Sequence, residues 1–176
     1  MPDVKKNIIR KSELSLPSDC STLCLKPKRK RFPVNLSKNF TLEEMCATST
    51  GVLNAVNDEA KRSLLYLCQY VLQPVRNEIG ALKITSGYRS SGVNSAVGSR
   101  PSSQHLYGEA ADFIPLGDLP IDNVYRWIVK VSGIPFGQCI RESKDGKDWI
   151  HISLPRLDKL NQQALIYDGK DYKNYV

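Results

Sequence analysis

Ser-Gln-His-Leu-Tyr-Gly-Glu-Ala-Ala-Asp, residues 103–112, places an imidazole and a carboxylate seven positions apart, on either side of a glycine. The second of the two histidines in the chain follows in Trp-Ile-His-Ile-Ser, residues 149–153. Two histidines and one aspartate leave the fourth position of a tetrahedral metal site open to water, which is typical of catalytic zinc. His105, Asp112 and His151 are therefore candidate zinc ligands, although a buried histidine taken alone is more often a hydrogen-bonded core group.

Two further stretches stand before these motifs, namely ITSGYRS at residues 84–90 and VNSAVGS at residues 93–99. In this order, the four stretches resemble peptidase M15, the family of zinc D-Ala-D-Ala carboxypeptidases and phage endolysins. The family hallmark, S-x-H-x-x-G-x-A-x-D with a distal histidine, is matched at every fixed position. The resemblance extends over about residues 40–172, including NQQALIYDGKDY at its end. Ser99 departs from the pattern, because the family often has a second glycine there.

This resemblance implies an α+β fold in which a small antiparallel sheet is flanked by helices, as in hedgehog and D-Ala-D-Ala-peptidase domains. It also implies a zinc metallopeptidase that hydrolyses peptide bonds of peptidoglycan stem peptides, either as an endopeptidase or as a D,D-carboxypeptidase. His105, Asp112 and His151 would be the zinc ligands. Arg89 would bind the substrate carboxylate or the developing oxyanion with its planar guanidinium, and a local ion pair is the alternative. Ser103 would support the substrate or the ligand loop.

Two carboxylates before His151 are candidates for the general base. Asp148 lies three residues before that histidine and Glu142 lies nine before it. If Asp145-Gly146 forms a two-residue hairpin turn, the facing pairs are 144 with 147, 142 with 149 and 140 with 151. Strand alternation then puts Glu142 on the face of His151 and Asp148 on the other face, which favours Glu142. A wider loop would reverse this order and favour Asp148.

The basic residues of the chain are concentrated in a segment that the sequence predicts to be an extended or disordered arm, residues 1–39. Residues 1–40 hold ten lysines and arginines against three acidic residues, so they carry the whole net charge of +7. A run such as KPKRKR, residues 26–31, is commonly a solvated tail. The functional alternative is an electrostatic anchor for an anionic wall polymer, a nucleic acid or a virion protein.

The pattern over residues 40–176 predicts a single α+β domain. Thr41 to Glu44 has the spacing of a capping box, so a short helix is expected there. Apolar residues recur at three and four over residues 58–79, which predicts an amphipathic helix that Pro74 kinks and Gly80 ends. The serine- and glycine-rich residues 91–104 are predicted to be a loop. The other predicted elements are strands at 82–86, 109–114, 137–142, 149–154 and 164–167 and a helix at 121–131.

The rest of the sequence bears on where the protein acts. No apolar run reaches the roughly 20 residues that cross a bilayer, and the N-terminal segment lacks the apolar core of a signal peptide. Five scattered cysteines favour a reducing compartment over a disulfide framework. The sequence therefore predicts cytoplasmic synthesis without a signal peptide and action at the cell wall, for a phage-encoded or virion-associated protein. A non-catalytic, zinc-containing virion or wall-binding module is the alternative function.

Overall fold

The structure, a computed structural model, describes residues 33–156 and 162–175. Its contacts divide the chain into two units, Met1–Arg31 and Phe32–Val176. The basic run and the rest of the predicted arm up to residue 32 lie outside the described residues, so the state of the arm stays a prediction. The segment that follows belongs to the folded unit, because Leu36 and Phe40 are buried in its core.

The helical segments of the described chain lie before and between the first three strands, and the last four strands follow one another without a helix. They are α1 (Leu42–Met45), α2 (Asp58–Leu67), the π-helical η1 (Cys68–Leu72), α3 (Gln73–Ile79), α4 (Ser91–Ala96), the 3-10 turn η2 (Gln104–Tyr107) and α5 (Ile121–Lys130). The capping box is confirmed at the start of α1, where the Thr41 hydroxyl accepts a hydrogen bond from the Glu44 amide. No helix among the described residues is long and apolar enough to cross a membrane.

The predicted helix over residues 58–79 is a continuous helical path with one irregular turn. Its central part, η1, is π-helical, and Pro74 follows within the first turn of α3. A proline donates no backbone hydrogen bond and its ring clashes with the carbonyl four residues earlier, which favours a wider turn just before it. Gly80 ends α3 with a φ of 100°, as predicted.

The prediction of a loop over residues 91–104 was wrong in part, because α4 occupies its first six positions. The Ser90 hydroxyl caps α4 by accepting a hydrogen bond from the Val93 amide at 3.4 Å. Val93 and Asn94 are buried. A helix this short is stabilised by its cap and by tertiary packing rather than by intrinsic propensity, so its composition alone resembles that of a loop.

One six-stranded sheet forms the other layer of the domain. Its strands are β1 (Leu82–Ser86), β2 (Ala110–Pro115), β3 (Gln138–Lys144), β4 (Lys147–Ser153), β5 (Gln163–Tyr167) and β6 (Tyr172–Asn174). They are ordered β1-β2-β4-β3-β5-β6. The α+β class is therefore confirmed. Every neighbouring pair is antiparallel except β3 and β5, which are parallel, so the sheet is mixed and the predicted antiparallel arrangement does not hold for this one pair.

The parallel pair follows from which strand edges are free. Both edges of β4 are occupied, one by β2 and the other by β3. β5 pairs with the other edge of β3 and runs opposite to β4. Because β3 and β4 are antiparallel, a strand that runs opposite to β4 runs parallel to β3.

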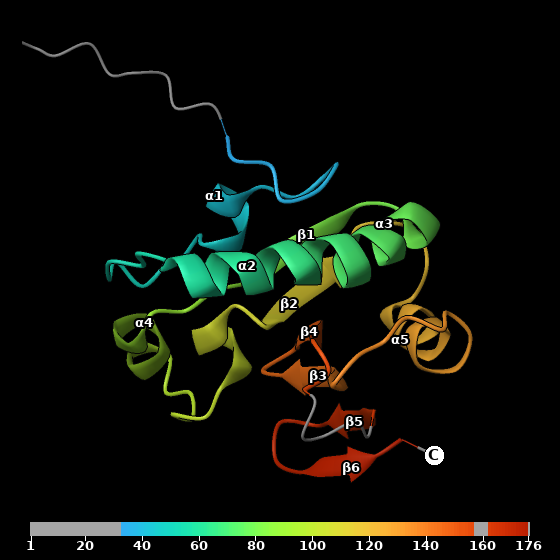
Figure 1. The fold of residues 1–176 in the computed structure, drawn as a ribbon. Helices are drawn as coiled ribbons and strands as arrows, with labels where there is room; N and C mark the ends of the chain where they lie inside the picture. The colour runs from blue at the N-terminus through green and yellow to red at the C-terminus, as the bar shows by residue number, and fades with distance from the viewer. Residues whose placement is uncertain (1–32, 157–161, 176) are drawn as a thin grey trace, which may run out of the picture. The chain divides into compact units, whose positions relative to one another are not determined.

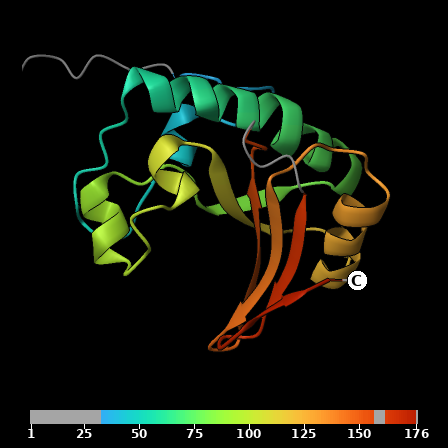
Figure 2. The ribbon, with the colours of Figure 1, turned by 60° about the horizontal axis from the view of Figure 1, so that its bottom comes forward.

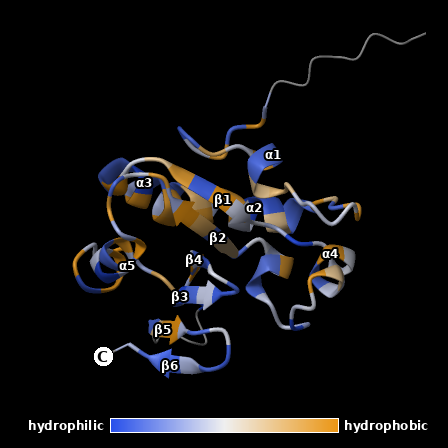
Figure 3. Cartoon of the chain, turned by 180° about the vertical axis from the view of Figure 1, so that it is seen from behind, coloured by the Kyte–Doolittle hydropathy of each residue, from blue (hydrophilic) through white to orange (hydrophobic). Residues whose placement is uncertain are grey.

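The two faces of the sheet differ in what covers them. Figures 1 and 2 show the path from α2 to α3 lying across the sheet, with α5 also packed against it. Together these helices and one sheet face form the core, whose buried members include Leu64, Val71, Phe113, Ile128, Ile150 and Ile152. In Figure 3, β2 is hydrophobic over most of its length, whereas α2 and α5 carry residues of both kinds. The opposite face of the strands carries the polar residues described next.

Candidate metal centre

The motif of residues 103–112 is divided between a turn and a strand, since η2 carries His105 and β2 carries Asp112. Gly108 turns the chain between them with a φ of 69°. A Cβ at this position would collide with the carbonyl oxygen of Ala60 on α2. The motif therefore needs glycine here both for the left-handed conformation and for the close approach of two backbone segments.

His151 reaches the same point from β4, where it is the direct cross-strand partner of Asp112. His151 Nδ1 lies 2.8 Å from Asp112 Oδ1, and His105 Nε2 lies 3.3 Å from each of these two atoms. Around a tetrahedral zinc with bonds of about 2.0–2.1 Å, ligand atoms are roughly 3.3 Å apart. All three side chains are buried, and their donor atoms converge, so they could hold one metal ion.

The orientation of the His105 ring is set by a backbone carbonyl. His105 Nδ1 lies 2.7 Å from the carbonyl oxygen of Gly87, so Nδ1 carries the proton and Nε2 presents its lone pair to the site. Burial lowers the pKa of His105, although the charge of Asp112 opposes it, and the neutral imidazole is the form that binds metal. Gly87 approaches the backbone of Met45 so closely that no side chain would fit. This role of the glycine of ITSGYRS was not predicted from the sequence.

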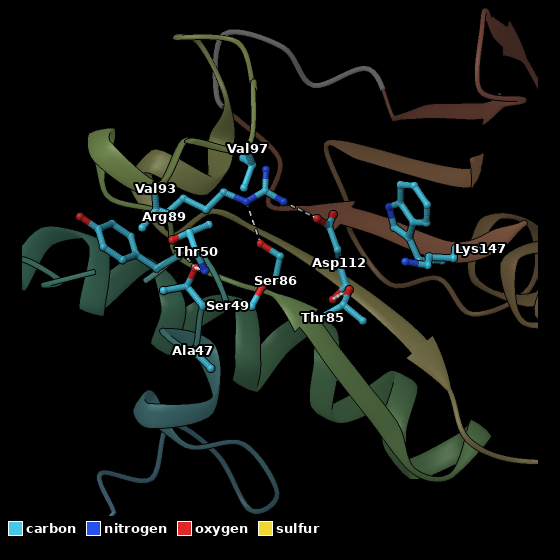
Figure 4. A pocket seen from close by; sticks show the side chains of 13 residues that line it. Ala47, Ser49, Thr50, Thr85, Ser86, Arg89, Val93, Val97, Asp112 and Lys147 are labelled. Atoms are coloured by element: carbon cyan, nitrogen blue, oxygen red, sulfur yellow. Dashed lines mark hydrogen bonds and ion pairs between the residues drawn. The ribbon is translucent and has the colours of Figure 1, made fainter. Parts of the chain in front are cut away.

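The two carboxylate oxygens of Asp112 have different partners, since Oδ1 faces the two histidines and Oδ2 faces an arginine. Arg89 Nη2 donates to Asp112 Oδ2 at 2.6 Å, and Arg89 Nε donates to Ser86 Oγ at 2.7 Å (Figure 4). Burial raises the pKa of Asp112, but the two histidines outweigh it and hold that pKa well below its usual value. Asp112 is therefore an ionised candidate ligand whose position Arg89 fixes. The local ion pair foreseen for Arg89 is present, and its role toward substrate stays a prediction.

The hairpin between β3 and β4 has the register that the Asp-Gly turn predicts. Its facing pairs include 144 with 147, 142 with 149 and 140 with 151. Asp145 and Gly146 both have positive φ, 52° and 72°, as a two-residue turn of this kind requires. Glu142 therefore lies on the face of His151, two pairs closer to the hairpin turn, and lines the same cleft as the three candidate ligands. Burial, followed by the charge of Asp112, raises the pKa of Glu142.

Asp148 lies on the opposite face of the hairpin, where it forms an ion pair. Its Oδ1 accepts a hydrogen bond from Arg141 Nη1 at 2.8 Å, while Arg141 Nε donates to Asp122 of α5. The hydrogen bond from Arg141 lowers the pKa of Asp148. The structure thus brings Glu142, and not Asp148, to the candidate metal centre. Which carboxylate acts as general base stays a prediction, and this geometry favours Glu142.

Ser103 directly precedes η2 as its N-cap residue and lines the cleft, but its side chain makes no capping hydrogen bond. The preceding loop accommodates serine at position 99 without positive φ, because Gly98 alone takes the left-handed conformation there, with a φ of 67°. The buried side-chain amide of Asn94 donates to the carbonyl oxygens of Ser99 and Arg100, at 3.3 and 3.1 Å. This anchors the loop to α4, so the departure from the family pattern leaves the loop ordered.

The cleft at the candidate ligands has a volume of about 1220 Å³ and extends beyond the motifs. Its lining includes Tyr167 and Tyr172 from β5 and β6, and Arg100 from the loop after α4. These three residues were not predicted from the sequence. No local pattern marks them, because long-range strand pairing brings β5 and β6 to the cleft.

Comparison with known proteins agrees with this geometry. The family model described as Peptidase M15 matches residues 38–153, which include all three candidate ligands, Arg89 and Glu142. The chain therefore belongs to the peptidase M15 family, and the resemblance noted in the sequence is confirmed. No curated protein matches the chain. Membership defines the chain as a peptidase by family, with a buried His-Asp-His cluster that could bind a metal ion. The match ends at β4, so β5 and β6 lie beyond it.

Proposed function

We propose that the protein is a zinc metallopeptidase that hydrolyses peptide bonds of peptidoglycan stem peptides, as an endopeptidase or a D,D-carboxypeptidase. The observation that carries this proposal is the convergence of His105, Asp112 and His151 in a cleft that also contains Glu142. Two imidazoles and one carboxylate are the donor set of catalytic zinc sites, whose fourth position stays open. A zinc ion held there would lower the pKa of a bound water to about 7 and polarise the carbonyl of the scissile bond.

The residues around the ligands have separate roles in this proposal. Glu142 would accept the proton of the attacking water and return it to the leaving amine, which requires a carboxylate with a pKa raised toward neutral pH. Its burial and the nearby negative charge of Asp112 act in this direction. Arg89 would hold Asp112 and, with its remaining N–H groups, stabilise the developing oxyanion or bind the substrate carboxylate. Ser103 would contact the substrate at the edge of the cleft.

Metal analysis and digestion of purified muropeptides test this proposal together. We expect one zinc per chain and peptide products, identified by mass, that disappear on chelation and return when zinc is added. Asp112→Asn should lose both the metal and the products. Asp118→Asn should keep both, because Asp118 is exposed and does not line the cleft. Zinc binding without any muropeptide cleavage would favour a non-catalytic virion or wall-binding module instead.

We further propose that the basic arm attaches the enzyme to an anionic wall polymer or a virion protein, and that the protein acts at the cell wall as a phage-encoded or virion-associated hydrolase. The support is the charge, since residues 1–40 carry a net +7 and the remainder of the chain is neutral. Deletion of residues 1–31 should reduce pelleting with purified walls at low salt, and high salt should reduce pelleting of the full chain. Salt-insensitive pelleting that survives the deletion would contradict this role.

A further inference from the structure

The register of the sheet creates ordered rows of side chains on the face of the metal centre. One row crosses the sheet from Asp112 through His151 to Ile140 and Leu165. The next row on this face, two pairs closer to the hairpin turn, consists of Trp149, Glu142, Tyr167 and Tyr172. Rows two residues apart on a strand are separated by roughly 6.6–6.8 Å. The second row therefore lies beside the metal centre, with Glu142 between an indole and two phenols.

Tyr167 and Tyr172, here called the tyrosine pair, stack on each other with ring centroids 4.6 Å apart and an interplanar angle of 27°. Tyr172 nevertheless remains 53% exposed, although it lines the cleft. A large aromatic side chain that is exposed inside a cleft offers contact area to a ligand at little loss of conformational entropy. Burial and the charge of Glu142 raise the pKa of Tyr172, and the charge of Arg100 opposes them, so both charged groups act on this phenol.

Arg100 lines the same cleft with a positive charge, and a hydrogen bond fixes its backbone. Its side chain is exposed and makes no ion pair with any residue in the described ranges. Its carbonyl oxygen accepts a hydrogen bond from the buried amide of Asn94 at 3.1 Å. This anchor restricts where the guanidinium can reach before any ligand binds, which reduces the entropy lost on binding.

Three arginines line the cleft, and two of them form ion pairs with acidic residues of the protein. Arg89 pairs with Asp112, and Arg156 pairs with Glu109. Glu142 lies on the sheet face next to the candidate ligands, where the proposed reaction uses it. Arg100 is thus an arginine of this cleft that remains available to a substrate. A guanidinium beside phenol hydroxyls is suited to a carboxylate, which accepts hydrogen bonds from both.

We propose that Arg100 and the tyrosine pair bind a free carboxylate of the peptide substrate beside the reacting bond, and so determine the specificity of the cleft. This inference rests on the proposed peptidase function and names a chemical feature of its substrate. Arg100 supplies the charge, Tyr172 donates a hydrogen bond, and Tyr167 supports the ring of Tyr172. The three residues come from the α4–η2 loop, β6 and β5, and two of these elements lie outside the family match.

The test compares one muropeptide in two forms, with its free carboxyl groups intact and with those groups amidated. For the zinc-loaded wild-type protein we expect a KM roughly tenfold lower for the free acid, the effect of one charge-assisted hydrogen bond. Arg100→Ala should raise KM for the acid about tenfold, leave KM for the amide and kcat largely unchanged, and so abolish the preference. Tyr172→Phe should raise KM for the acid by a smaller factor. Arg126→Ala, which removes an exposed arginine of α5 outside the cleft, should behave as wild type.

Calorimetric binding of both peptides to zinc-loaded Glu142→Gln protein separates this inference from the proposed function. If the acid binds in an Arg100-dependent manner but wild type cleaves neither peptide, the peptidase proposal fails and the carboxylate subsite stands. If wild type cleaves both peptides equally well and Arg100→Ala changes neither KM, the subsite is overturned while the peptidase proposal stands. If neither peptide binds nor reacts, both proposals are overturned. The zinc content of every variant should equal that of wild type, because none of these changes removes a ligand.

Discussion

The two faces of the β2–β4–β3 sheet are built from the same strands and have opposite characters. On one face Phe113, Ile150 and Ile152 are fully buried under helices in a continuous apolar core. On the other face their sequence neighbours, Asp112 and His151, converge on a candidate metal centre beside an open cleft. Residues one position apart therefore contribute either to stability or to chemistry.

This contrast shows how strongly the site depends on strand register. Successive side chains of a strand point to opposite faces, so a slip by one residue would exchange the two sets. The Asp145-Gly146 turn sets the register of β3 against β4, and the apolar face stabilises it. The apolar core thus stabilises the register that positions the polar face, although none of the candidate ligands belongs to the core face. Variants on the two faces should accordingly separate function from stability.

The largest effect is expected from removing a ligand on the site face. His105→Ala should reduce the bound zinc well below one per chain and bring muropeptide cleavage below detection, because two ligands rarely retain a catalytic zinc. The fold should persist, since the core lies on the other face. Metal analysis and melting curves of both proteins in chelator measure this. An unfolded variant would show that the face with the metal centre also carries the stability of the domain.

The next effect concerns the two carboxylates on opposite faces of the hairpin. Glu142→Gln should lower kcat by roughly 10²–10⁴-fold with the zinc retained, as expected for loss of general acid–base catalysis. Asp148→Asn removes an exposed partner of Arg141 and should leave kcat nearly unchanged. Steady-state kinetics with matched metal loading distinguish them. A larger loss in Asp148→Asn would mean that the hairpin rearranges when substrate binds.

A substitution on the core face should lower stability and leave zinc binding unchanged. Phe113→Ala should lower the free energy of unfolding by about 3–5 kcal/mol, because it leaves a cavity in the core beside its cross-strand partner Ile150. The zinc content of the folded fraction should be unchanged. Urea denaturation measures this loss of unfolding free energy. Tyr172→Ala is the matched control, because it truncates an exposed aromatic residue on the site face. Its loss of unfolding free energy should be much smaller. Equal losses in the two variants would remove the distinction between the faces.

The smallest effect on stability is expected from the alkaline titration of a buried thiol in the core. Burial raises the pKa of Cys68 from 9.0 to about 12. The folded protein then keeps a proton that the unfolded chain releases, so stability is fully present below pH 9 and falls as pH rises toward 12. The slope for one such thiol is about 1.4 kcal/mol per pH unit. Urea denaturation at pH 8 and pH 10 should show a smaller decrease for Cys68→Ala than for wild type, and equal decreases would contradict the assignment.

Local features of the sequence were sufficient for much of the site. The His-Asp spacing, the distal histidine and the order of the four motifs identified the family and the three residues that converge. The Asp-Gly dipeptide predicted the register that puts Glu142 beside them, because a two-residue turn leaves few alternatives for the pairs that follow. The helix over residues 58–79 was visible in its apolar stripe. Each of these signals is itself a short, contiguous stretch of the sequence.

Other features depended on contacts between distant segments. Composition could not reveal α4, whose few residues are stabilised by burial. The parallel pairing of β5 with β3 brings Tyr167 and Tyr172 beside Glu142, and it arises because both edges of β4 are already occupied. The sequence by itself therefore determined the candidate ligands and the hairpin, through turn geometry and strand alternation. Only the tertiary structure decided what surrounds them, because strand order and edge availability depend on the packing of the whole sheet.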